Sequence, residues 1–143
     1  MKISRFSFSA FQESTFVIWD DESLECAIID PGCYYSRERQ VLENFISKNN
    51  LKVKYLLLTH IHLDHYFGAP FVARTYNVPV SASQDDEFLL EMMSMQADMY
   101  GTPLPDAPIA IGNYLKAGDT LYLGTEPIEV RQVPGHSKGS LAY

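Results

Sequence analysis

The stretch Tyr55-Leu56-Leu57-Leu58-Thr59-His60-Ile61-His62-Leu63-Asp64-His65 joins a short apolar run to a dense group of ionisable side chains. Its first four residues are all apolar, which is typical of a strand that is covered on both faces. The next seven bring three of the chain's four histidines and one aspartate into a single loop. We therefore expect the chemistry of this protein at the carboxyl end of a buried strand.

The fourth histidine lies in a second turn, Pro134-Gly135-His136-Ser137-Lys138-Gly139-Ser140. A catalytic zinc ion takes neutral imidazole nitrogens and carboxylate oxygens and keeps one position open for water. Because His60 and His62 are two positions apart in an extended loop, their side chains project to the same side. The pattern predicts that these two and His136 bind one ion, while Asp64 and His65 could face a second.

Length and composition bound the class of protein. The 143 residues fit one domain, and 46% hydrophobic with 20% charged residues is ordinary for a folded protein. The net charge of -7 repels phosphate backbones, so we expect no nucleic-acid partner. The N-terminus lacks the apolar core of a signal peptide, and no apolar run approaches the roughly 20 residues of a membrane span. We expect a cytoplasmic protein with no membrane partner, and the two cysteines, Cys26 and Cys33, as reduced thiols.

Periodicity along the chain predicts an α/β fold that opens with a meander of three strands, the first two joined by a turn at Gln12-Glu13-Ser14. The expected strands are residues 2–8, 15–19, 26–29, 55–58, 78–80, 120–123, 128–133 and 141–143. The expected helices are 37–50, 67–76 and 84–100, of which the last is the longest. Three acidic residues lie near its N-terminal end, where the helix dipole favours negative charge. Its methionines, Met92, Met93, Met95 and Met99, are expected in the core or in a lid. The proline-containing segment 101–108 is expected to be a loop that could cover a substrate.

The motifs together resemble those of the metallo-β-lactamase superfamily. Thr59 to His65 resembles its metal-binding motif, Ile29-Asp30-Pro31-Gly32 its earlier Asp-Pro-Gly turn, and Pro134 to Ser140 its third motif. Their order and approximate spacing agree with the family. Within the superfamily, the chain is most similar to small bacterial hydrolases related to glyoxalase II, the hydroxyacylglutathione hydrolase.

The resemblance implies an αβ/βα sandwich with the metal at one edge, between two sheets. It implies that His60, His62 and His136 bind one ion and that Asp64 and His65 bind a second, with Asp64 also counted as catalytic. Asp30 would orient one of the metal-ligand side chains without itself binding the ion. The implied cofactor is one or two Zn²⁺ ions, with iron or manganese as alternatives. The implied partner is a small-molecule thioester, such as a glutathione conjugate, attacked by metal-activated water.

The resemblance covers this whole chain but only about the first two-thirds of such a protein. The family's bridging aspartate and last histidine have no counterpart, because no aspartate, glutamate or histidine follows His136. We therefore expect residues 1–143 to be a single, C-terminally incomplete domain: the N-terminal half of the sandwich plus the first strands of the second half. A bare strand edge at Tyr143 could be covered by a second copy of the chain in a homodimer.

Two other functions stay open at this point. One is an enzyme like the persulfide dioxygenases, which keep a single iron on two histidines and an aspartate. The other is an inactive metal-binding module, because the C-terminal ligands are absent. Hydrolysis of β-lactams, lactones and phosphodiesters uses the same kind of site. Lys138 could reach an anionic substrate, but we expect a solvated lysine instead. Tyr34 and Tyr35 could line the pocket, with packing as the default explanation.

Overall fold

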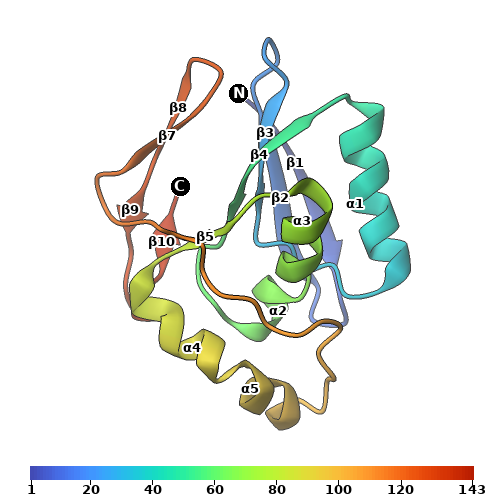
Figure 1. Cartoon of the computed structure of the whole chain (residues 1–143), viewed down its shortest axis with the longest axis vertical. Coiled ribbons are helices and arrows are strands. Elements are labelled where there is room, and N and C mark those ends of the chain that lie inside the picture. Colours follow the sequence, from blue (N-terminus) through green and yellow to red (C-terminus); the bar gives the residue numbers. More distant parts are fainter.

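A six-stranded sheet with the order β1-β2-β3-β4-β5-β6 forms the centre of the computed structural model, which describes all 143 residues (Figure 1). Neighbours in this sheet are therefore also neighbours in the sequence. Four further short strands form two antiparallel pairs, β7 with β8 and β9 with β10. The strands are β1 (Lys2–Phe8), β2 (Glu13–Trp19), β3 (Glu25–Ile29), β4 (Lys52–Leu57), β5 (Val80–Ala82), β6 (Asn113–Tyr114), β7 (Thr120–Leu123), β8 (Glu126–Glu129), β9 (Arg131–Gln132) and β10 (Leu141–Ala142).

Strand direction changes within the main sheet. The first three strands form the predicted antiparallel meander, whereas β3 to β6 pair in parallel. Parallel neighbours need a crossover connection, which is usually helical. The helices in these connections are α1 (Ser36–Lys48), α2 (Leu63–Tyr66), α3 (Ala69–Tyr76), the 3-10 turn η1 (Gln84–Asp86), α4 (Glu87–Glu91) and α5 (Met93–Met99). The carboxyl ends of the parallel strands consequently meet at one edge, beside α2 and α4 (Figure 1).

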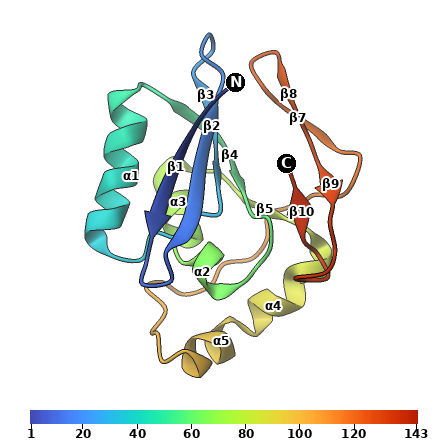
Figure 2. The same ribbon diagram turned by 180° about the vertical axis from the view of Figure 1, so that it is seen from behind.

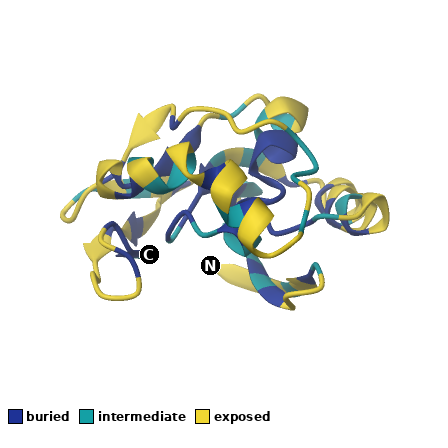
Figure 3. Cartoon of the chain, turned by 90° about the horizontal axis from the view of Figure 1, so that it is seen from below, coloured by how far each residue is buried: buried dark blue, intermediate teal, exposed yellow.

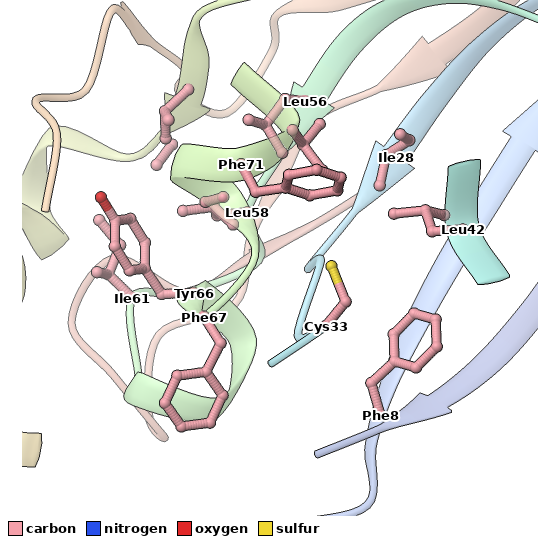
Figure 4. Packing of buried hydrophobic residues seen from close by; sticks show 14 of the residues in the cluster. Phe8, Ile28, Cys33, Leu42, Leu56, Leu58, Ile61, Tyr66, Phe67 and Phe71 are labelled. Atoms are coloured by element: carbon pink, nitrogen blue, oxygen red, sulfur yellow. The ribbon is translucent and has the colours of Figure 1, made fainter. Parts of the chain in front are cut away.

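Both faces of the main sheet are covered, as the apolar run of β4 predicts. Leu56 packs into a cluster that includes residues of α1 and α3, and Leu57 points to the other face, into a cluster with β7, β8 and β10. Figure 4 shows Leu42 of α1 and Phe71 of α3 beside Ile28 and Leu56 on the helical side. The layers are thus helices, main sheet and short strand pairs (Figure 2), which is one half of an αβ/βα sandwich plus the first strands of the other half.

Burial follows these layers. The strands in the middle are largely buried, whereas the outward surfaces of the helices are exposed (Figure 3). In α1, Leu42 and Ile46 are buried, whereas the neighbouring Val41 is exposed. No helix of the structure combines the length and the apolar character that crossing a membrane requires.

The single long helix predicted over residues 84–100 is wrong. The segment begins with η1 and continues as two short helices that meet at Met92. Met92 has φ -90° and ψ 7°, in the bridge region between the α and β conformations, and there α4 ends. Of the four methionines expected in the core or a lid, only Met93 is buried. The longest helix is instead α1, with 13 residues.

Two strand boundaries also differ from the prediction. The strand predicted over 128–133 is two strands, since β8 ends at Glu129 and pairs with β7, whereas β9 begins at Arg131 and pairs with β10. The chain changes partners at the buried Val130, whose N–H donates to the carbonyl of Asp119. Near the N-terminus, Glu13 is not part of a turn but the buried first residue of β2.

Replacing Leu56 by alanine should test the central position of β4. This fully buried side chain lies in the apolar cluster with α1 and α3, so Leu56→Ala should lower the free energy of unfolding by about 2–5 kcal/mol. Val41→Ala on the exposed surface of α1 should change it by less than about 0.5 kcal/mol. Urea denaturation of both variants gives the comparison, and equal effects would contradict the layer assignment.

Candidate metal centre

The parallel pairing of β3 with β4 places two sequence motifs side by side. Ile29 lies opposite Leu57 in this pair, so Asp30 and the histidine loop leave the sheet at the same edge. Asp30 has φ 51°, in the left-handed region that aspartate tolerates better than most residues. Its carboxylate accepts the Thr59 N–H at 2.7 Å and the Thr59 hydroxyl at 2.6 Å. The Asp-Pro-Gly turn is thereby fixed against the first residue of the histidine motif.

A chain of hydrogen bonds determines which nitrogen of His60 carries the proton. Because the Thr59 hydroxyl donates to Asp30, its oxygen is left to accept from Nδ1 of His60, 2.9 Å away. The proton therefore sits on Nδ1 and the lone pair on Nε2. This Nε2 is buried and has no hydrogen-bond partner. A buried polar atom without a partner is costly, which makes Nε2 of His60 a candidate metal ligand.

Three imidazole rings surround one point at the mouth of the site. The ring centroids of His60 and His62 are 4.8 Å apart, those of His60 and His136 4.8 Å, and those of His62 and His136 4.6 Å. Nδ1 of His62 and Nε2 of His136 approach to 3.0 Å. One ligand nitrogen from each ring lies within 4.8 Å of the other two. The structure thus brings together the three residues that the sequence assigns to the first ion.

His65 and Asp64 lie on the other side of His60. Nδ1 of His65 donates to the Asp30 carboxylate at 3.0 Å, which leaves Nε2 facing the Asp64 carboxylate at 3.6 Å. The His60 and His65 rings are 4.2 Å apart. Ligand atoms of Asp30, His60 and His65 also lie within 4.8 Å of one another, but Asp64 belongs to no such group of three. Asp30 thus lies against the Nδ1 side of His65, where its carboxylate accepts a hydrogen bond from the ring.

Burial and neighbouring charges separate the three histidine pKa values of the loop. Burial and the nearby His65 lower the pKa of His60 to about 4. Burial and the nearby His136 also lower the pKa of His62. The pKa of His65 is raised instead, because its hydrogen bond to Asp30 and the charges of Asp30 and Asp64 outweigh the effect of burial. His60 and His62 are thus held in the neutral form that a metal ion requires.

The third motif reaches the histidine loop through the last strand of the chain. His136 lies in the loop between β9 and β10, and the N–H of Leu141 in β10 donates to the Thr59 carbonyl at 2.8 Å. The Tyr143 hydroxyl donates to the Leu58 carbonyl at 2.7 Å. These contacts bring His136 beside residues that lie more than 70 positions earlier.

Glu13 is a member of the site that the sequence analysis missed. Its side chain is buried, and one carboxyl oxygen accepts the Thr15 hydroxyl at 2.9 Å, while the other has no partner and lies 3.9 Å from Nδ1 of His65. Burial raises its pKa to about 9, and the charges of Asp30 and Asp64 add to the rise. The alternation of β2, in which Glu13, Thr15 and Val17 are buried, is the signal that could have found it.

Two residues from the helical segment were also missed. Gln96 of α5 accepts the Leu63 N–H at 3.0 Å and so holds the first turn of α2. Asp86 is fully buried and accepts hydrogen bonds from both the histidine loop and the third motif. In the sequence, Asp86 is one of three consecutive acidic residues, Asp85, Asp86 and Glu87, and nothing local distinguishes it from its neighbours.

A pocket of about 320 Å³ opens onto the histidines. Its lining residues are Phe11, His62, Leu63, Asp64, His65, Gln96, Tyr100 and His136. The loop 101–108, expected to cover a substrate, contributes none of these and instead lines a neighbouring pocket of about 220 Å³ with Tyr34 and Tyr35. Tyr34 is also fixed by its hydroxyl to the Pro103 carbonyl, and Lys138 is exposed. Cys26 and Cys33 are free, buried thiols.

The residues present fit a divalent metal ion. The imidazoles of His60, His62 and His136 converge, and the buried Nε2 of His60 has a lone pair without a partner. Two carboxylates, Asp30 and Asp64, add negative charge beside them, and Asp30 acts as the outer partner that ligating histidines usually have. Imidazole and carboxylate ligands suit zinc and also iron or manganese, so the donor set does not select one metal.

An αβ/βα sandwich with a histidine cluster at the end of its central strands is the arrangement of a metallohydrolase-type fold. Sequence comparison identifies the family. The chain belongs to the Metallo-beta-lactamase superfamily, whose sequence profile matches residues 9–143. It is 35% identical over 144 residues to the hydroxyacylglutathione hydrolase GloC of Haemophilus influenzae, in a match that covers 100% of this chain and 66% of that protein. The chain thus spans about two-thirds of the length of this relative.

Solved structures with the same fold confirm the sandwich architecture. The BLEG-1 B3 metallo-beta-lactamase has a TM-score of 0.82 at 25% identity, covering 98% of this chain and 65% of that one. TTHA1623, solved in a di-iron-bound form, has a TM-score of 0.78 at 25% identity, covering 96% of this chain and 64% of that one.

Glu13→Gln should test the buried carboxyl group. Between the ordinary pKa of 4.5 and about 9, the folded protein retains a proton on Glu13 that the unfolded chain releases. The free energy of unfolding of the unsubstituted protein therefore falls as the pH rises through this window. Glutamine keeps an oxygen for the Thr15 hydroxyl but does not titrate.

We expect Glu13→Gln to raise the melting temperature of the metal-free protein more at about pH 8 than at about pH 5. Circular dichroism melts at both pH values measure the difference. Glu43→Gln on the exposed surface of α1 serves as the control and should show no such pH dependence. An equal gain at both pH values would mean that Glu13 does not hold a proton in the folded state.

Proposed function

We propose that this chain carries the metal-binding half of a hydrolase that acts on a thioester. The observation that carries the proposal is the convergence of His60, His62 and His136, with the His60 tautomer fixed so that an unpaired Nε2 lone pair is available. A structural zinc site would favour cysteine ligands, and both cysteines are free thiols outside the cluster. An open pocket beside the histidines supports a catalytic site over a purely structural one.

Each residue of the site has a distinct task in this proposal. His60, His62 and His136 would hold one ion, and Asp64 and His65 would hold a second. Asp30 orients His65 and, through Thr59, the ring of His60. When bound, Zn²⁺ or a similar ion supplies a water of lowered pKa and polarises a carbonyl oxygen.

The pocket supports a small-molecule substrate. Phe11 and Tyr100, whose ring centroids are 5.5 Å apart, supply the aromatic part of its lining. No lysine or arginine lines this pocket, so an uncharged acyl group fits it better than a phosphodiester. The similarity to GloC supports a hydroxyacyl thioester, such as a glutathione conjugate, as the class to assay first.

A single-iron enzyme is the second candidate. Asp30, His60 and His65 form a group of one carboxylate and two imidazoles, the ligand set typical of non-haem iron oxygenases. Against it, the Asp30 oxygens already accept from Thr59 and His65, which leaves less capacity for an ion. Metal content separates the candidates: one iron with oxygen uptake supports this one, and two ions with thioester hydrolysis support the first.

His62→Ala should test the proposed function. Removing one of three imidazoles should reduce the metal content by about one equivalent and lower thioester hydrolysis by at least about 100-fold, because an intact ligand set fixes the ion. Mass-spectrometric metal analysis and a hydrolysis assay on the purified protein give the two readouts. Asn44→Ala, on the exposed surface of α1, should leave both unchanged. Full activity in His62→Ala would overturn the assignment.

A further inference from the structure

Asp86 connects the two loops that supply the metal-ligand histidines. It is the last residue of η1, directly before α4, and its side chain is fully buried. Both ribbon views place the start of α4 beside the loop between β9 and β10 (Figures 1 and 2). Asp86 lies between the histidine loop and the third motif. A buried carboxylate is costly unless it is fully hydrogen-bonded, so the donors that these two loops supply to it matter for both.

One carboxylate oxygen of Asp86 serves both loops. Oδ2 accepts the N–H of Ile61 at 3.1 Å, from the residue between His60 and His62. The same oxygen accepts the Ser137 hydroxyl at 2.8 Å, from the residue after His136. A single atom thus fixes how far the backbone of one ligand loop lies from the other.

The other oxygen fixes the far side of the third motif. Oδ1 accepts the Gly139 N–H at 2.7 Å. A Cβ at Gly139 would lie 2.7 Å from the Asp86 backbone nitrogen and 2.7 Å from Oδ1, so only glycine permits this approach. Within the loop, the N–H of Ser137 donates to the Ser140 hydroxyl at 3.1 Å, which closes the turn around the carboxylate.

We propose that Asp86 is the positioning residue that sets the separation between His136 and the pair His60 and His62. The inference rests on the proposed metal site for its functional meaning, but the contact itself can be tested without metal. Asp86 belongs to neither group of candidate metal ligands and lines no part of the pocket, so it acts through its hydrogen bonds to Ile61, Ser137 and Gly139 rather than by binding the ion.

Asp86→Asn is the informative substitution. An amide offers one accepting oxygen in place of two, so it cannot serve Gly139 on one side and Ile61 with Ser137 on the other. In one orientation its NH₂ group faces the Gly139 N–H, and in the other it faces the Ile61 N–H. Asp85→Asn is the matched control, because it removes the same charge from the adjacent, exposed residue.

The first measurement is hydrogen–deuterium exchange of the metal-free protein. We expect the amides of segments 59–65 and 134–140 to exchange at least about tenfold faster in Asp86→Asn, while those of β1, β2 and α1 keep their rates. A second measurement is Co²⁺ affinity by titration of the visible absorption bands. The dissociation constant should rise about 10- to 100-fold in Asp86→Asn and stay within about twofold in Asp85→Asn.

The two measurements separate the inference from the proposed function. Unchanged exchange in both segments, or equal Co²⁺ affinity in the two variants, overturns the role of Asp86. If the unsubstituted protein binds no Co²⁺, the proposed metal site fails, and the exchange rates alone then decide on Asp86. If Asp86→Asn does not fold, Ser137→Ala removes a single hydrogen bond to the same carboxylate. It should then accelerate exchange in the same segments to a smaller extent, and no acceleration overturns the inference.

Discussion

The parallel pairing of β3 with β4 is the constraint on which the site depends. It brings Asp30, at the end of one strand, within hydrogen-bond distance of Thr59, at the end of the next. From this contact follow the fixed tautomer of His60 and the orientation of His65. The pairing in turn requires a crossover helix on one face and a covered apolar strand, which α1 and the two apolar clusters supply. The strand pairing that forms the centre of the sheet therefore also positions the residues of the site.

The site concentrates groups that do not stabilise the fold by themselves. Burial holds His60 neutral and keeps a proton on Glu13, and His60 retains a ring nitrogen without a partner. Buried ionisable groups with strongly shifted pKa values cluster at functional sites, because the same arrangement that costs stability prepares a group for binding or catalysis. A divalent cation would relieve this arrangement by accepting the free lone pairs and offsetting the carboxylates. The remainder of the molecule, with its two apolar clusters, provides the stability that the site does not.

Local pattern predicted the elements that are local in origin. The meander, α1 and β4 follow from the spacing of apolar residues within each segment, and the histidine spacing predicted a common ligand direction for His60 and His62. One long helix was predicted over 84–100 because helix-forming residues continue through the whole segment. The helix is interrupted at Met92 by its backbone conformation, which the composition does not indicate. The single strand predicted over 128–133 is two strands, because strand propensity does not indicate where the chain changes from one partner strand to another.

The sequence by itself indicated a metal site, because four histidines in two short motifs leave few other interpretations, and it predicted the opening meander of three strands. It also predicted Asp30 as a supporting residue through the resemblance. Only the tertiary structure revealed Glu13 and Asp86, since their roles arise from burial and from contacts across 25 to 53 positions of sequence. An acidic residue at a surface and one that joins two buried loops look identical in a sequence. Their difference lies in the hydrogen-bond donors that the fold brings to them.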